Sequence, residues 1–201
     1  MGTRNLLVEL LVEELPPKSL RKLGENFANL LSQSLISQYL AASTTIVTSY
    51  ATPRRLAVHL TEVLSQAPDQ QQSHKLMPAA IGLDSSGQPT PALLKKMGSL
   101  GIETFDVSQL KRAMDGKTEA LFLERTVTGI TLVNGLQIAL EQVMAQLPIP
   151  KVMAYQLADG WSTVNFVRPA HSLIALYGTT VVAINLLGLA AGNSTRGHRF
   201  E

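Results

Sequence analysis

Apolar residues follow two spacings in the first third of the chain, and the two spacings predict different elements. Residues 5–12 are mostly apolar, with a charged exception at Glu9, and this predicts a strand. From residue 18 to about residue 38 the apolar positions recur every three or four residues, which predicts an amphipathic helix. Residues 44–50 and 55–63 predict two further strands. The order strand, helix, strand, strand favours an open α+β sheet with a helix on one face.

The pattern changes after residue 64, where glutamine, proline and glycine become frequent and interrupt any long periodicity. We expect short helices over residues 91–99 and 108–114 in this part of the chain. A strand is predicted over residues 120–127, which are rich in apolar positions. Residues 65–128 are therefore predicted to form a small inserted α/β arm.

The last third predicts a second amphipathic helix and an apolar hairpin. The helix covers residues 132–146 and ends before prolines at positions 148 and 150. Strands over residues 172–177 and 180–187 form the hairpin, which we expect to pack back on the first part of the chain. The predicted fold is α+β, with mixed and antiparallel sheet regions, two amphipathic helices and the inserted arm. Its three segments are residues 1–64, 65–128 and 129–201.

Composition excludes several classes of protein. Hydrophobic residues make up 45% of the 201 residues, which excludes a disordered chain, and the net charge of +2 is too small for a protein that is basic throughout. No cysteine is present, so disulfides, cysteine zinc sites and cysteine nucleophiles are excluded, and we expect a reducing, cytoplasmic location. The uncharged stretch between Arg168 and Arg196 is long enough to cross a membrane, but Gly178 and Asn185 within it favour paired strands.

Motifs for catalysis, nucleotides and metals are incomplete in this sequence. Residues 188–194 have some likeness to a phosphate-binding loop but carry asparagine at position 193, where that loop requires lysine. The four histidines lack metal-ligand spacing, and no Gly-x-Ser-x-Gly segment presents a serine nucleophile. We therefore expect no catalytic residue, metal or cofactor in this chain. His171 stays open between a structural hydrogen bond and a small-molecule active site shared with Arg168.

Basic residues gather at the ends of predicted elements, beside proline or glycine. Arg54 and Arg55 follow Pro53 in a tight turn between two predicted strands. Arginine and lysine at such corners are typical contacts for a sugar-phosphate backbone, which they recognise through charge and shape. The candidate RNA-binding residues are Arg54, Arg55, Lys151, Arg168, Arg196, His198 and Arg199. The alternative is that some of these arginines brace loops or pair with three glutamates, Glu9, Glu13 and Glu14.

Five segments resemble, in order, the motifs of a single family. They are residues 7–17, which end in Val-Glu-Glu-Leu-Pro-Pro, residues 51–57 (Ala-Thr-Pro-Arg-Arg-Leu-Ala), residues 147–153 (Leu-Pro-Ile-Pro-Lys-Val-Met), residues 166–171 (Phe-Val-Arg-Pro-Ala-His) and residues 195–200 (Thr-Arg-Gly-His-Arg-Phe). Together they resemble the bacterial glycyl-tRNA synthetase beta subunit over nearly the whole chain. The sequence departs from that family at Ala154-Tyr155, where Arg-Trp is usual, and at Ser172, where Trp is frequent.

The resemblance implies that this chain is the amino-terminal fragment of a longer beta subunit, and its basic end at residues 196–201 suggests the same. The family forms an α2β2 tetramer in which the alpha subunit carries the ATP and glycine sites and the beta subunit supplies tRNA recognition. We therefore expect ATP-dependent glycylation of tRNA by the whole enzyme. This chain would bind tRNA for glycine and dock the alpha subunit, with no DNA or membrane partner. The alternative is a subunit-docking module that makes no RNA contact.

Overall fold

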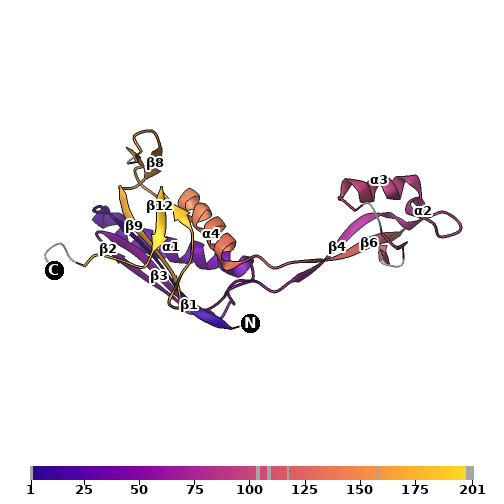
Figure 1. Ribbon diagram of the computed structural model, residues 1–201, viewed down its shortest axis with the longest axis horizontal. Coiled ribbons are helices and arrows are strands. Elements are labelled where there is room, and N and C mark those ends of the chain that lie inside the picture. Colours follow the sequence, from indigo (N-terminus) through magenta and orange to yellow (C-terminus); the bar gives the residue numbers. More distant parts are fainter. Residues whose placement is uncertain (1, 103–104, 108–109, 117, 158, 198–201) are drawn as a thin grey trace. The chain divides into compact units, whose positions relative to one another are not determined.

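The computed structural model describes residues 2–102, 105–107, 110–116, 118–157 and 159–197. The chain divides into two compact units. The sheet unit comprises residues 1–68 and 129–201, and the small unit comprises residues 69–128 (Figure 1). Each unit has a hydrophobic core of its own.

A seven-stranded sheet forms the body of the sheet unit. β1 (Thr3–Val12) lies at its centre and pairs antiparallel with β3 (Arg55–Leu64) on one side and with β9 (Ala170–Tyr177) on the other. β2 (Val47–Thr52) is the edge strand beside β3. The other side of β9 is completed by three short strands, β10 (Thr180–Val181), β12 (Leu189–Gly192) and β11 (Asn185–Leu186). Of these pairings only the one between β12 and β9 is parallel within the described residues.

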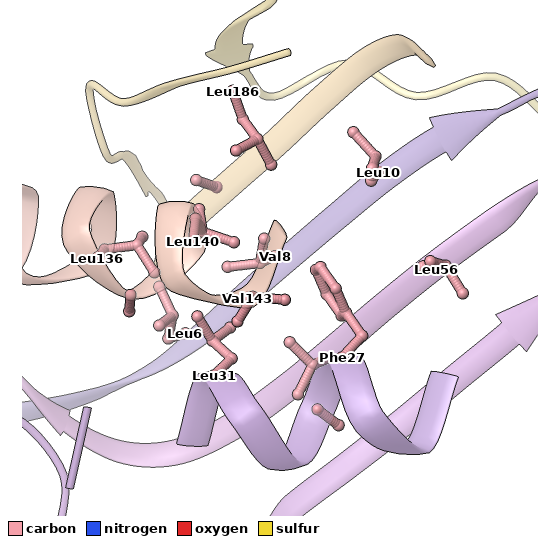
Figure 2. Close-up of a cluster of buried hydrophobic side chains, with 14 of the residues drawn as sticks. Leu6, Val8, Leu10, Phe27, Leu31, Leu56, Leu136, Leu140, Val143 and Leu186 are labelled. Atoms are coloured by element: carbon pink, nitrogen blue, oxygen red, sulfur yellow. The ribbon is translucent and has the colours of Figure 1, made fainter. Parts of the chain in front are cut away.

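Two helices, α1 (Pro17–Ser37) and α4 (Leu132–Gln146), cover one face of this sheet. Side chains alternate along a strand, so Leu6, Val8 and Leu10 of β1 point to the same face. Figure 2 shows them in one buried cluster with Phe27 and Leu31 of α1 and with Leu136, Leu140 and Val143 of α4. Each fully buried leucine contributes about 1.5–3 kcal/mol of hydrophobic stabilisation. The intervening β1 residues, Leu7, Glu9 and Leu11, point to the opposite face of the sheet.

The hairpin of β7 (Met153–Gln156) and β8 (Thr163–Phe166) forms a separate two-stranded sheet. Its turn is closed by the carboxylate of Asp159, which accepts hydrogen bonds from the backbone N–H groups of Trp161 and Ser162 at 2.9 Å each. The Ser162 hydroxyl donates to the other carboxylate oxygen. Trp161 is 90% exposed at this turn.

The small unit has an antiparallel sheet in the order β4 (Gln70–Pro78), β6 (Thr118–Val127) and β5 (Leu110–Asp115). Helices α2 (Ala79–Gly82) and α3 (Pro91–Ser99) supply the rest of the unit. Its core contains the buried residues Leu76, Ala79, Leu83, Leu93, Met97, Leu110, Leu121 and Leu123. The Thr90 hydroxyl accepts a hydrogen bond from the backbone of Leu93 and so caps α3.

The structure confirms the predicted α+β class and most of the predicted elements. It contradicts the helix predicted over residues 108–114, because residues 110–114 belong to strand β5, while residues 108 and 109 lie outside the described residues. Pairing with β6, which the local pattern does not encode, decides that conformation. The strand predicted over 180–187 is also too long, since only residues 180–181 and 185–186 pair. In the part of the chain that is described, no helix combines the length and apolar character that crossing a membrane requires.

Candidate functional site

Three segments that are far apart in sequence are tied together at one end of the central sheet. The backbone N–H of Val12 donates to the carbonyl of Arg54 at 2.9 Å, and that of Leu15 donates to the carbonyl of Pro53 at 2.6 Å. The N–H of Glu13 donates to the carbonyl of Pro169 at 3.0 Å. The end of β1, the β2–β3 turn and the segment before β9 therefore form one surface. We call the charged residues gathered there the arginine corner: Glu9, Glu13, Glu14, Arg54, Arg55, Arg168, His171 and Arg196.

Arg54 lies on the turn between β2 and β3 and faces solvent. Its Nη2 lies 3.4 Å from Oε1 of Glu14, and the two side chains are 42% and 75% exposed. An ion pair this open to water contributes about 0–1 kcal/mol, because water competes for both charges. The guanidinium of Arg54 can therefore exchange Glu14 for another anion at little cost.

Arg55, the next residue, is mostly enclosed by protein. Its Nε lies 3.4 Å from Oε1 of Glu9, and the side chains are only 28% and 10% exposed. Its Nη2 donates to the backbone carbonyl of Arg196 at 2.6 Å. The hydroxyl of Thr195 donates to the same oxygen of Glu9. Glu9 therefore joins β1, β3 and the segment that follows β12.

Arg168 braces two neighbouring loops. Its Nε donates to the carbonyl of Glu14 at 3.1 Å, and its Nη1 donates to the carbonyl of Val167 at 3.0 Å. The same Nη1 lies 3.0 Å from Sδ of Met153 at the start of β7. Nε2 of His171 lies 3.6 Å from Oε1 of Glu13, and both side chains are exposed to solvent. The start of α1 and the β7–β8 hairpin are thus fixed around Arg168.

The structure brings four of the proposed RNA-binding residues together and leaves a fifth apart. The four are Arg54, Arg55, Arg168 and Arg196. Lys151 is exposed between α4 and β7, and within the described residues it forms no hydrogen bond or ion pair with the corner. The two others, His198 and Arg199, lie outside the described residues.

The alternative interpretation is that some of these arginines pair with glutamates. Two such pairs are present, Arg54 with Glu14 and Arg55 with Glu9. Sequence reasoning missed Thr195 and Met153 as partners. Neither residue type signals such a role, and both come close only through the tertiary fold.

The corner holds basic and acidic side chains in close contact. Among the residues that the structure describes, no group of three histidine or acidic side chains could hold a metal ion. A hollow of about 270 Å³ lies elsewhere, between α1 and α4, and is lined by polar side chains such as Ser34 and Gln142. Four arginines stand against three glutamates, so the corner has a small excess of positive charge.

The chain is similar to one family over almost its whole length. Residues 6–201 match the family described as glycyl-tRNA synthetase beta subunit. The chain belongs to this family. Curated members named glycine–tRNA ligase beta subunit from Janthinobacterium sp. (strain Marseille) and Nitrosomonas eutropha are each 60% identical over 201 residues, which is 100% of this chain and 29% and 28% of theirs. The member from Leptothrix cholodnii is also 60% identical, and 28% of its length is covered. The chain therefore spans less than a third of these relatives.

Four of the five segments that resemble glycyl-tRNA synthetase beta subunit motifs supply residues of the arginine corner, and the fifth, residues 147–153, contacts Arg168 through Met153. Residues 7–17 supply the glutamates, and residues 51–57 supply Arg54 and Arg55. The other three segments supply Met153, Arg168 with His171, and Thr195 with Arg196. The motifs of this family, scattered along the sequence, thus meet at one place in the fold.

Proposed function

We propose that this chain is part of the beta subunit of a glycine–tRNA ligase and that its arginine corner holds tRNA during ATP-dependent glycylation. Four of the five family-like segments meet at this corner and the fifth contacts it, and this convergence is the observation that carries the proposal. In this proposal the enzyme is a cytoplasmic α2β2 tetramer. Its alpha subunit binds ATP and glycine, and this chain takes part in binding without supplying a catalytic group.

Electrostatics supports a phosphate at the corner. Arginine presents planar N–H donors that match a phosphate group, and such contacts position a nucleic acid without reading its sequence. Arg54 is the strongest candidate because its side chain is 42% exposed and, within the described residues, pairs with a solvent-facing carboxylate. Lys151, Arg168 and Arg196, with His198 and Arg199 beyond the described residues, would extend the contact along the RNA backbone.

We test this with Arg54→Ala in the complete ligase, using Arg4→Ala as the matched control. Arg4 is an exposed arginine near the start of β1, at the other end of that strand from the corner. Loss of one phosphate contact should lower the slope of log affinity against log salt by about 0.7–0.9 and weaken tRNA binding about 3- to 10-fold at low salt. Arg4→Ala should leave both quantities unchanged. Equal effects of the two variants would speak against a specific phosphate contact at Arg54.

A second candidate function is docking of the alpha subunit, and the β7–β8 hairpin favours it. Trp161 is 90% exposed on a turn that Asp159 holds in shape. Val152 and Met153, at the base of the hairpin, are also exposed, at 54% and 39%. Exposed tryptophans on rigid turns are typical anchors of protein interfaces. Trp161→Ala should weaken alpha-subunit binding while leaving the tRNA salt slope intact, as measured by analytical ultracentrifugation and filter binding.

A further inference from the structure

We propose that Glu9, Arg55 and Thr195 form a lock that positions residues 193–197, and with them Arg196, for contact with the RNA phosphate backbone. The proposal rests on the proposed function and deepens it, because it assigns neighbouring arginines different roles. Arg54 contacts the polyanion, whereas Arg55 is a positioning residue that acts through the segment after β12.

Glu9 is unusual for its place in the sheet. It lies on the central strand, opposite Ala57 of β3 and Ile174 of β9, and it is only 7% exposed. A carboxylate enclosed to this extent needs a cation and hydrogen-bond donors around it, because water no longer solvates its charge. Arg55 and Thr195 supply them, both at Oε1.

The partners of Glu9 also hold a segment that has no regular secondary structure. Residues 193–197 follow β12 and are all exposed, so side-chain contacts have to fix their path. Thr195 anchors the segment to β1 through its hydroxyl, and Arg55 anchors it to β3 through the carbonyl of Arg196 at 2.6 Å. The two anchored residues, Thr195 and Arg196, are consecutive. Their contacts therefore define both the position and the direction of the backbone from which the Arg196 side chain projects.

The lock predicts opposite effects for two glutamates of the same corner. Removal of a negative charge ordinarily strengthens binding of a polyanion, and Glu14, which is 75% exposed beside Arg54, should behave in this way. Loss of Glu9 also removes a negative charge, but it frees Arg55 and Thr195 and releases the segment that they hold. We therefore expect Glu9→Ala to weaken tRNA binding and Glu14→Ala to leave it unchanged or strengthen it.

The experiment uses the complete ligase with tRNA for glycine, titrated over a salt series, and four variants: Glu9→Ala, Glu14→Ala, Thr195→Val and Arg55→Ala. Thr195→Val is nearly isosteric and changes no charge, so a weaker affinity would reflect the lost hydroxyl contact. We expect at least 3-fold weaker binding for Glu9→Ala, Thr195→Val and Arg55→Ala. Hydrogen exchange of the peptide that covers residues 193–197 should be faster in the same three variants and unchanged in Glu14→Ala. Thermal unfolding of each variant checks that the remainder of the fold is intact.

The outcomes separate this inference from the function on which it rests. Unchanged exchange at residues 193–197 in Thr195→Val and Arg55→Ala would show that no lock exists. Faster exchange with unchanged or tighter tRNA binding in Glu9→Ala, while Arg54→Ala weakens binding, would overturn the positioning role. If Arg54→Ala has no effect either, the tRNA function itself fails, and the exchange data still decide whether the lock is present.

Discussion

Asp159 shows how one carboxylate can organise a turn that presents a large apolar side chain. The hydroxyl of Ser162 and the backbone N–H groups of Ser162 and Trp161 donate to it, and these hydrogen bonds lower its pKa from the ordinary value. Because the pKa is lower in the folded turn, the ionised carboxylate stabilises that turn above the ordinary aspartate pKa of about 3.9. This stabilisation is lost as the pH falls through the lowered folded pKa.

Trp161 provides a direct measurement of that turn, since it is the only tryptophan among the 201 residues. We expect its fluorescence to stay constant from neutral pH down to about pH 4 and to change below it, as Asp159 becomes protonated. Asp159→Ala should remove this acid transition and give an altered emission already at neutral pH. An identical titration in the variant would mean that other groups control the turn.

For the neighbouring arginines at the corner, the sequence predicts their position at an element end but not their burial or their partners. The rule that proline and glycine mark element ends is enough to predict that Arg54, Arg55 and Arg168 lie at corners. The rule does not distinguish Arg54, which is 42% exposed, from Arg55, which is 28% exposed and bound to Glu9. Burial and pairing depend on which strands are neighbours in space, and that information is spread over the whole chain.

At the scale of elements, helix α1 carries a glycine where the packing leaves no room for a larger residue. A Cβ added at Gly24 would lie 2.7 Å from Cβ of Ala51 on β2, which is closer than carbon atoms normally approach. Helix propensity alone favours alanine over glycine by about 1 kcal/mol. Overpacking of a buried contact costs about 1–3 kcal/mol, so the packing term should prevail.

We therefore expect Gly24→Ala to lower the free energy of unfolding by about 1 kcal/mol, measured by urea denaturation. Gly98→Ala in α3 is the matched control, because no atom lies within 4 Å of a Cβ added there. That substitution should stabilise its helix by up to about 1 kcal/mol. A gain in stability from both substitutions would indicate that α1 can shift away from β2.

Elements with a clear apolar period can be predicted from the sequence, and those held by their neighbours cannot. Helices α1 and α4 and strands β1 and β3 each bury a regular set of side chains, and the apolar spacing predicts all four. β4 has one buried position, Leu76, among nine residues, so its composition is typical of a loop. The helix predicted in place of β5 is wrong for a similar reason, since Leu110 is the only buried residue among the six of β5. Cross-strand pairing with β6 stabilises both strands, and such pairing lies outside any local window.

At the scale of the whole molecule, residues 69–128 are inserted into the sheet unit between two segments of backbone that lie side by side. Gln66 pairs with Thr131 as a β-bridge, and the N–H of Ala67 donates to the carbonyl of Ile130 at 2.9 Å. The chain therefore leaves and re-enters the sheet unit at adjacent positions. A short linker can join those positions in place of residues 69–128, because they are adjacent and closing a short loop costs little entropy.

Replacement of residues 69–128 by a Gly-Ser linker should leave the sheet unit folded and cooperative. The small unit contributes 60 of the 201 residues and has its own core, so the dependence of unfolding free energy on urea should fall by roughly 30%. Urea denaturation followed by circular dichroism, with the complete chain as reference, checks this. A gradual transition without cooperativity would mean that the sheet unit needs the small unit to fold.

The central position of β1 sets an order of events during translation. Leu7 pairs with Leu176 of β9, so 169 residues must leave the ribosome before β1 gains its second neighbour. At 5–20 residues per second this takes about 8–34 s, during which that side of the nascent strand is open. The strands described within residues 69–128 pair with one another, so this unit can fold within that interval. In a ribosome-bound chain stalled before residue 170, a protease should therefore cut residues 1–68 faster than residues 69–128.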